Sequence, residues 1–266
     1  MFFCRKDKLL YGAFSNLAAL PGIFHGVFTR LERQHPGSKG NLNVGTNSGN
    51  PPAAVESGRR AIAGCMDDAE LVFLNQVHGK EVAVIKTGHE RQRAVKSPPT
   101  ADAVITQIPG AGLAIQAADC QSVMLCDPVR GVAANIHSGW RGSISNIIDA
   151  CIDTMKREFA VDPADLSAGI GPSLGPCCAE FVHYRQEIPK GFWKYRDDKD
   201  RFDFWQISRD QLRVAGVKPE NVECAHVCTM CNPHLFYSYR REGSTGRFAA
   251  VVGLKREINH DHTANR

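Results

Sequence analysis

Short apolar runs separated by polar turns make up most of the chain, and their spacing predicts strands that alternate with helices. Residues 23–30 and 71–77 are rich in β-branched and aromatic side chains, which predicts two strands. The second is expected to continue into a hairpin over 71–88, with its turn at 78–80. Between the two strands, a long loop rich in Gly, Pro and Asn leads into a predicted helix near 53–65.

Three further strands are predicted in the middle of the chain, within residues 101–107, 114–127 and 131–139. The polar and basic segment 88–100 that precedes them contains a pair of prolines and predicts a mobile surface loop. After the last of these strands the apolar period becomes helical, which predicts a helix over 143–159, capped by the serine at its start. Its apolar face consists of Ile144, Ile147, Ile148, Cys151, Ile152 and Met155.

The C-terminal third shows the same alternation of elements. Residues 166–181 predict a strand, a Gly/Pro-rich turn and the start of a helix. Residues 202–216 predict a helix that is capped by Asp203 and stopped by a glycine, and residues 235–254 predict a closing hairpin. Because strands and helices interleave without a linker or a repeat, we predict one α/β (α+β) domain over residues 1–266, with mixed strand directions.

Length and composition narrow the class of protein. The 266 residues can bury a full core, and 43% apolar with 23% charged residues is ordinary for a globular protein. The net charge of +4, with no basic block interleaved with aromatics, argues against nucleic acid as a partner. The apolar stretches are too short to cross a membrane and no signal peptide is evident, so we expect a cytoplasmic monomer or homodimer with its ten cysteines reduced.

Cysteine and histidine at the ends of predicted strands are the first candidates for chemistry. Cys120 and His137 lie at the ends of neighbouring apolar runs, and His78 lies in the predicted turn at 78–80. Thiolate and imidazole both bind zinc, and a catalytic zinc site uses three protein ligands and one open position. We therefore predict a metal site at His78, Cys120 and His137; the residues alone leave open a structural role for His137.

Arg141 precedes the predicted helix 143–159. A helix N-terminus carries unpaired N–H groups and a partial positive charge, both of which attract anions. An arginine at that place can bind a phosphate group through two parallel hydrogen bonds. Arg141 beside a metal held by one cysteine and two histidines would suit attack by phosphate or by water on a bound substrate.

A second group of metal-ligating residue types lies nearer the C-terminus, and its members are Cys224, His226, Cys228, Cys231 and His234. The C-x3-C-x2-C spacing of its cysteines is not that of a regular zinc knuckle, so we do not predict a structural zinc there. Of the adjacent pair at 177–178, one thiol is expected in the core. The chain lacks the G-x-S-x-G, Walker A, dinucleotide-binding and zinc-deaminase motifs.

Short motifs occur in a fixed order from about Asn41 to Leu254, a stretch that makes up most of the chain. They are Asn75-Gln76-Val77-His78-Gly79, Ala101-Asp102-Ala103, Ala118-Asp119-Cys120, His137-Ser138-Gly139-Trp140-Arg141-Gly142, Ile170-Gly171-Pro172, Gly175-Pro176-Cys177-Cys178, Tyr237-Ser238-Tyr239-Arg240-Arg241 and Thr245-Gly246-Arg247. As an ordered set they resemble the YfiH-like family, whose members are called multicopper polyphenol oxidase or laccase-domain proteins.

This resemblance implies a mixed α/β fold with a β-sandwich-like core flanked by helices, related to cysteine hydrolases. It implies a metal, usually zinc with copper as an alternative, held by His78, Cys120 and His137. It also implies purine nucleoside phosphorylase activity on adenosine, inosine and methylthioadenosine, with adenosine deaminase activity alongside. Some bacterial relatives are described instead as peptidoglycan editing factors, and others as copper-dependent laccases.

With these roles, Cys120, His137 and Arg141 are the expected catalytic residues. The expected substrate-binding residues, which would hold the purine nucleoside and phosphate, are Asn43, Arg141 and Arg240. The chain departs from the family pattern around Asn43, where the usual Ser-Leu-Asn-Leu-Gly reads Asn-Leu-Asn-Val-Gly and the following Gly-Asp reads Gly-Asn. The usual His-Ala-Gly-Trp-Arg reads His-Ser-Gly-Trp-Arg, which keeps His137 and Arg141.

Three other functions remain open at this point. If His137 activates Cys120 as a nucleophile, the chain is a metal-free hydrolase that edits a cell-wall precursor. Copper oxidation of phenols requires several coppers and many histidines, and ten histidines with one H-x-H pair, at 260–262, argue against it. A metal-stabilised binding module would fill the fourth metal position with a protein ligand.

Overall fold

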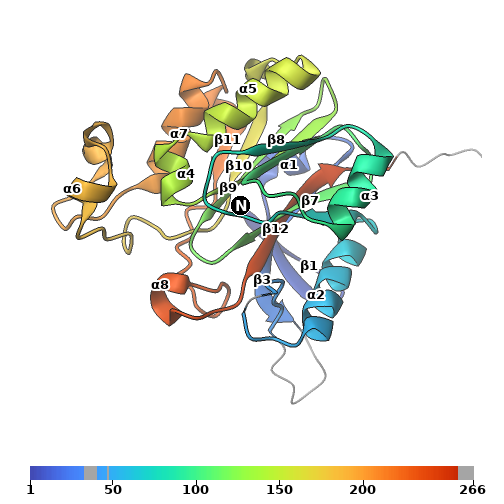
Figure 1. Ribbon diagram of the computed structural model, residues 1–266, viewed down its shortest axis with the longest axis horizontal. Coiled ribbons are helices and arrows are strands. Elements are labelled where there is room, and N and C mark those ends of the chain that lie inside the picture. The colour runs from blue at the N-terminus through green and yellow to red at the C-terminus, as the bar shows by residue number, and fades with distance from the viewer. Residues whose placement is uncertain (33–40, 47, 257–266) are drawn as a thin grey trace, which may run out of the picture.

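Two six-stranded sheets of mixed direction form the centre of the molecule (Figure 1). The computed structural model describes residues 1–32, 41–46 and 48–256. The first sheet has the spatial order β1 (Phe2–Lys6), β2 (Leu9–Ala13), β3 (Ile23–Glu32), β12 (Phe248–Leu254), β7 (Ala111–Ala117), β4 (Glu70–Phe73). The second has the order β11 (Val222–Cys224), β10 (Ser167–Ile170), β8 (Gln121–Asp127), β9 (Val132–Ser138), β6 (Ala103–Thr106), β5 (Val82–Ile85). Neighbouring strands are antiparallel except in the edge pairs β4–β7, β10–β11 and β5–β6, which are parallel.

The two sheets pack against each other through alternate side chains of their central strands. In β12, the even-numbered side chains join the core shared with the second sheet, and the odd-numbered ones pack under helix α2 (Pro52–Cys65). Asn135 of β9 is fully buried, and its Nδ2 donates to the carbonyl oxygens of Leu113 and Ala250, each at 2.9 Å. Because an unpaired buried amide is costly, these bonds fix the sheets relative to each other.

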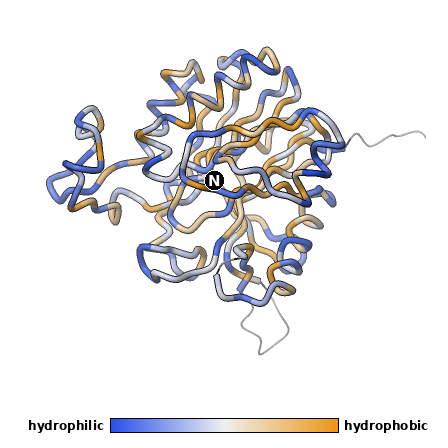
Figure 2. The backbone as a smooth tube through the Cα atoms, in the orientation of Figure 1, coloured by the Kyte–Doolittle hydropathy of each residue, from blue (hydrophilic) through white to orange (hydrophobic). Residues whose placement is uncertain are grey.

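Helices cover the outer faces of the sheets (Figure 1). Helices α5 (Ile147–Phe159) and α7 (Phe204–Val214) pack on the second sheet through side chains such as Ile148, Ile152 and Leu212. Hydrophobic segments accordingly follow the central strands, whereas hydrophobic and hydrophilic residues alternate along the peripheral helices (Figure 2). The shorter helices are α1 (Ser15–Ala18), α3 (Gly88–Lys96), α4 (Trp140–Ile144), α6 (Tyr184–Glu187), α8 (Tyr239–Glu242), η1 (Pro163–Asp165), η2 (Lys190–Tyr195) and η3 (Pro219–Asn221). Among the described residues, no helix has the length and apolar character needed to span a membrane.

The predicted fold class, mixed sheets in a sandwich-like core flanked by helices, is confirmed, but both predicted hairpins are wrong. Within 71–88, β4 belongs to the first sheet and β5 to the second, so the chain crosses between the sheets. Within 235–254, residues 239–242 form helix α8, and β12 pairs with β3 and β7. An alternating pattern identifies a strand but not its partner, and here the partners lie far away in the sequence.

Two segments differ from their predicted structure. The predicted surface loop 88–100 contains α3, which begins with a capping box formed by Thr87 and Glu90. The predicted helix over 143–159 is two helices, because Asn146 adopts a φ of 59° between α4 and α5. The side chain of Asn146 caps α5, and Ser143 therefore lies inside α4 rather than at an N-cap.

In the C-terminal third, the strand predicted at the start of 166–181 is present as β10 (Ser167–Ile170), but no helix starts within that range. The helix over 202–216 is confirmed as α7. Its N-cap is Asp203, whose side chain accepts from the N–H of Gln206, and Gly216 follows its end with a φ of 102°. Between these elements, the chain packs mainly on itself and forms a separate aromatic cluster that includes Phe202.

Candidate metal centre and active site

The ends of β7, β8 and β9 and the connection from β4 to β5 meet around a pocket of about 810 Å³. This volume is in the range of small-molecule binding sites. The single strand predicted over 114–127 is interrupted here, because residues 118–120 form a turn that carries the chain from the first sheet to the second. Asp119 has a φ of 92° in this turn, and the next residue, Cys120, lines the pocket.

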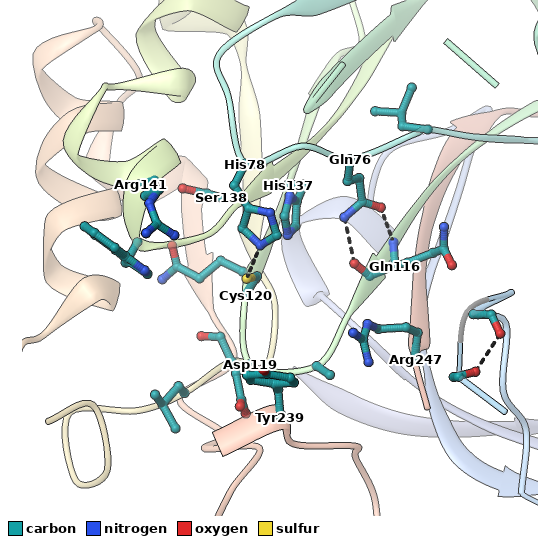
Figure 3. A pocket seen from close by; sticks show the side chains of 18 of the residues that line it. Gln76, His78, Gln116, Asp119, Cys120, His137, Ser138, Arg141, Tyr239 and Arg247 are labelled. Carbon is teal, nitrogen blue, oxygen red and sulfur yellow. Dashed lines mark hydrogen bonds between the residues drawn. The ribbon is translucent and has the colours of Figure 1, made fainter. Parts of the chain in front are cut away.

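His78, Cys120 and His137 converge on one point of the pocket wall, as Figure 3 shows. Their ligand atoms all lie within 4.8 Å of one another, and Cys120 Sγ is 3.7 Å from His78 Nε2. His137 is buried at the end of β9, whereas His78 is exposed to the pocket. The β4–β5 connection delivers His78, which has a φ of 60°. The structure thus brings together the three predicted metal ligands, which lie on three separate segments.

Asp102 holds two of these three residues in place. It is fully buried, and its Oδ1 lies 2.8 Å from His137 Nδ1. Its two oxygens also accept the backbone N–H groups of Val77, His78 and Gly79, at 3.2, 3.0 and 2.7 Å. With Nδ1 occupied, His137 offers Nε2 to the pocket. A carboxylate behind a histidine is a common arrangement around protein-bound metals.

The electrostatics of the site favour a thiolate at Cys120. Burial opposes ionisation of this thiol, but the adjacent His137 and hydrogen bonds from His137 and His78 lower its pKa to about 6. Burial likewise opposes the charge on His137, yet Cys120 and Asp102 raise the His137 pKa to about 9. Metals bind the thiolate form of cysteine, so one sulfur and two imidazole nitrogens form a donor set suited to zinc, and also to copper.

Comparison with known proteins assigns the family. The model described as "Multi-copper polyphenol oxidoreductase laccase" matches residues 24–255. The chain belongs to this family. Purine nucleoside phosphorylase YlmD of Geobacillus stearothermophilus is 30% identical over 254 residues, which cover 88% of this chain and 92% of the relative. Purine nucleoside phosphorylase YfiH of Escherichia coli is 31% identical over 223 residues, which cover 80% of this chain and 86% of the relative.

Solved structures of relatives share the fold of this family member. The hypothetical protein YfiH of Bacillus licheniformis superimposes with a TM-score of 0.82 at 26% identity, covering 95% of this chain and 99% of that chain. YlmD of Geobacillus stearothermophilus gives a TM-score of 0.81 at 25% identity, covering 96% and 99%. The predicted resemblance to the YfiH-like family is therefore confirmed.

Of the predicted substrate-binding residues, two line the pocket and one does not. Arg141 lines it, but from α4 rather than from the start of the long helix, which begins at Ile147. Arg240 also lines it, and its Nη1 donates to the carbonyl oxygen of Glu180 at 2.8 Å. The buried side chain of Asn43 instead accepts from the N–H groups of Gly45 and Arg247 and donates to Ser48 Oγ.

Arginines that the sequence analysis did not single out as site residues also line the pocket. Arg59 donates to Val44 O at 2.7 Å, and its guanidinium lies 3.9 Å from the ring centroid of Phe73. Arg247 donates to the carbonyl oxygens of Thr245 and Gly246. Arg247 belongs to a motif that carries the family resemblance, which was a signal for it. No comparable signal marked Arg59, because it lies in an ordinary amphipathic helix.

Gly139 has to lack a side chain for the metal ligands to converge. A Cβ at this position would lie 2.8 Å from His78 Cδ2 and 3.0 Å from Cys120 Sγ. We expect Gly139→Ala to weaken zinc binding by about 1–3 kcal/mol, the usual cost of overpacking. Zinc titration monitored by a competing chelator measures this, with Gly191→Ala as control because nothing lies near its Cβ position. Equal zinc affinity of the two variants would contradict the expectation.

Proposed function

We propose that this chain is a zinc-dependent purine nucleoside phosphorylase that acts on adenosine, inosine and methylthioadenosine, with adenosine deamination as a side activity. The convergence of His78, Cys120 and His137 in a pocket lined by four arginines carries the proposal. The names of relatives 30% and 31% identical to the chain support it. The volume of the pocket suits a nucleoside, and the positive charge of its arginines suits phosphate.

Phosphorolysis joins a phosphate oxygen to C1′ of the ribose and breaks the bond from C1′ to the purine nitrogen. A zinc ion on the three side chains would supply Lewis-acid polarisation of an oxygen of phosphate or water. Asp102 keeps the His137 ring oriented, so that its Nε2 faces the pocket. In this proposal Cys120 and His137 are catalytic as metal ligands, and the arginines position the anion.

Arg141 is the arginine best placed to bind the phosphate. Its guanidinium packs 4.3 Å from the ring centroid of Trp140 and donates no hydrogen bond to any of the residues that the structure describes. The guanidinium groups of Arg59, Arg240 and Arg247, by contrast, donate to backbone carbonyl oxygens. Arg141 therefore retains its donors for an incoming anion, for which a planar guanidinium is well suited.

We expect Arg141→Met to raise the KM for phosphate about tenfold, because a hydrogen bond to a charged partner contributes about 1.5 kcal/mol. Initial rates of inosine phosphorolysis at varied phosphate measure the change. Arg130→Met is the control, since Arg130 is exposed in the turn between β8 and β9, outside the pocket. An unchanged KM for phosphate in Arg141→Met would assign the anion to another arginine.

The decisive experiment is the release of hypoxanthine from inosine by the purified chain, with and without phosphate and with and without a chelator. We expect release that requires both phosphate and metal and returns when zinc is added back. Parallel assays with adenosine and methylthioadenosine test the substrate range, and conversion of adenosine to inosine tests deamination. A zinc-loaded protein that releases no purine base would contradict the proposal.

A second candidate is a hydrolase in which His137 activates Cys120 as a nucleophile, for example on a cell-wall precursor. The lowered pKa of Cys120 and the contacts of both histidines with this residue favour it. This function predicts activity that persists with chelator and is lost after alkylation of Cys120. Zinc phosphorolysis predicts instead that chelation abolishes activity and that bound zinc protects Cys120 from alkylation.

The family name also raises laccase chemistry. Within the described residues, the groups able to hold a metal are the His78, Cys120, His137 set and a cluster of four cysteines, so no histidine-rich copper cluster is formed there. The H-x-H pair at 260–262 lies outside the described residues. The His/Cys/His set could hold copper. A copper–thiolate absorption band after loading with Cu²⁺, together with phenol oxidation, would favour this function over phosphorolysis.

A further inference from the structure

Four cysteines outside the proposed active site lie together at one edge of the second sheet. The ligand atoms of Cys177, Cys178, Cys228 and Cys231 all lie within 4.8 Å of one another. The Sγ atom of Cys231 is 3.6 Å from that of Cys177 and 3.4 Å from that of Cys178. The spacing of cysteines within 224–234 predicts no zinc site. In the structure, Cys224 is not part of the group, and the adjacent pair Cys177 and Cys178 from a distant segment joins Cys228 and Cys231 instead.

Parallel pairing of β10 and β11 explains why the two segments meet. Loops that leave the carboxyl ends of neighbouring parallel strands emerge at the same edge of a sheet, and here one loop carries Cys177 and Cys178 and the other carries Cys228 and Cys231. The loops also pair with each other, because the N–H of Thr229 donates to the carbonyl oxygen of Ser173 at 2.9 Å.

The sulfur positions match metal coordination better than disulfide bonding. Four sulfurs at about 2.3 Å from a tetrahedral zinc ion lie about 3.8 Å from one another, close to the separations around Cys231. A disulfide requires about 2.05 Å between two sulfurs and serves only one pair. Cys228-Thr229-Met230-Cys231 also has the C-x2-C spacing that zinc sites use.

The backbone around Cys228 is arranged for a thiolate. The N–H of Gly175 donates to Cys228 Sγ at 3.3 Å, and the N–H of Cys231 is also directed at this sulfur. The turn that follows is closed by Asn232, which donates to the carbonyl oxygen of Cys228 at 2.9 Å. N–H groups directed at a sulfur stabilise its anionic form, which is the form that binds metal.

Three arginines complete the electrostatic environment. Arg201, Arg240 and Arg241 donate to carbonyl oxygens of the two cysteine-bearing loops, those of Cys177, Cys178 and Met230 respectively. A divalent ion with four thiolates carries a net charge of about −2. Because Arg201 is already paired with Asp197, the guanidinium groups of Arg240 and Arg241 are left to offset that charge.

We propose that Cys177, Cys178, Cys228 and Cys231 form a structural zinc site, separate from the His78, Cys120, His137 set. The ion ties the loop after β10 to the loop after β11. The first loop supplies Leu174 to the pocket wall. In the second, Thr229 Oγ1 donates to Asp119 Oδ1 at 2.6 Å, directly before Cys120. The site therefore holds the turn that positions Cys120.

Metal analysis of the full chain, purified under reducing conditions, loaded with zinc and desalted, tests the proposal. We expect two zinc ions per wild-type chain. The double variant Cys177→Ser, Cys231→Ser changes the two exposed thiols, and we expect it to retain one zinc and to lose about 5–10 °C in Tm. Cys4→Ser removes a thiol on β1, outside both clusters, and should keep both zinc ions. A double variant that binds as much zinc as the wild-type chain overturns the proposal.

Cobalt substitution gives a second test that does not depend on the folding of the double variant. The His78→Ala chain keeps all four cysteines and changes an exposed side chain. Loaded with Co²⁺, it should show at one equivalent the intense thiolate-to-cobalt absorption and visible bands of a tetrahedral four-sulfur site. A weak octahedral spectrum overturns the proposal. So does the recovery of these four cysteines as disulfides when the purified protein is denatured and alkylated without a reductant.

Discussion

Replacing His137 with alanine should lower kcat/KM for inosine phosphorolysis about a thousand-fold and reduce the zinc content by one ion per chain. His137 is the buried member of the His/Cys/His set, and it is the ligand whose ring Asp102 holds. Its loss leaves two ligands, one of them the exposed His78. A thousand-fold change corresponds to about 4 kcal/mol, in keeping with the several kcal/mol that a catalytic metal contributes.

His89→Ala is the matched control for this variant. His89 lies on helix α3 with its side chain exposed, and it does not line the pocket. The control should keep full activity and full zinc content. A His137→Ala chain with wild-type phosphorolysis would remove His137 from the chemistry. Loss of zinc without loss of activity would likewise reject the metal-dependent mechanism and leave the Cys120 hydrolase as the better candidate.

Sequence periodicity predicted the elements of this fold better than their pairing. The alternation in β12 and the helical spacing in α5 follow directly from which side chains are buried. The crossing from β4 to β5 could not be predicted, because a short connection that changes sheets has the same local pattern as a hairpin. The break at Asn146 was also missed, since a single residue in the left-handed region leaves the apolar spacing on both sides intact.

The candidate metal ligands could be predicted because polar residues at strand ends stand out from apolar runs. Cys120 and His137 were chosen on that ground, and the structure brings them together with His78. Arg141 was placed near the site for a reason that the structure does not support, since its helix is a short one before α5. The role of Asp102 had no local signal beyond its family motif, because its partners His137 and His78 lie on other segments.

The four-cysteine cluster, which lies outside the proposed metal centre, shows the same limit. The cysteines considered together within one segment included Cys224, which lies in β11 and packs against the hydrophobic core. Likewise, the ring of His226 packs against Trp205 at 5.5 Å. The members that do meet are Cys177 and Cys178, brought in by the parallel pairing of β10 and β11. A pairing between strands distant in the sequence leaves no periodic mark in either segment.

Asp102→Asn is the second substitution with a large expected effect, and it tests the carboxylate behind the ligands. We expect zinc affinity and kcat/KM to fall by up to about 100-fold, the effect typical of a residue that supports a metal ligand. The substitution keeps the size of the side chain but removes its charge. Whichever way the amide is turned, its NH₂ group faces a donor, either His137 Nδ1 or the N–H groups of Val77 and Gly79. Competition against a chelator and steady-state kinetics measure the two quantities.

Asp127→Asn separates this effect from a general loss of stability. Asp127 is also fully buried, and its Oδ1 accepts the N–H groups of Val129 and Arg130 at the opposite end of β8. Both variants are expected to lose about 1–3 kcal/mol in the free energy of unfolding, because each weakens buried hydrogen bonds to the backbone. Only Asp102→Asn should also lose zinc affinity. If both variants bind zinc as the wild-type chain does, Asp102 orients no ligand, and its hydrogen bonds serve the fold alone.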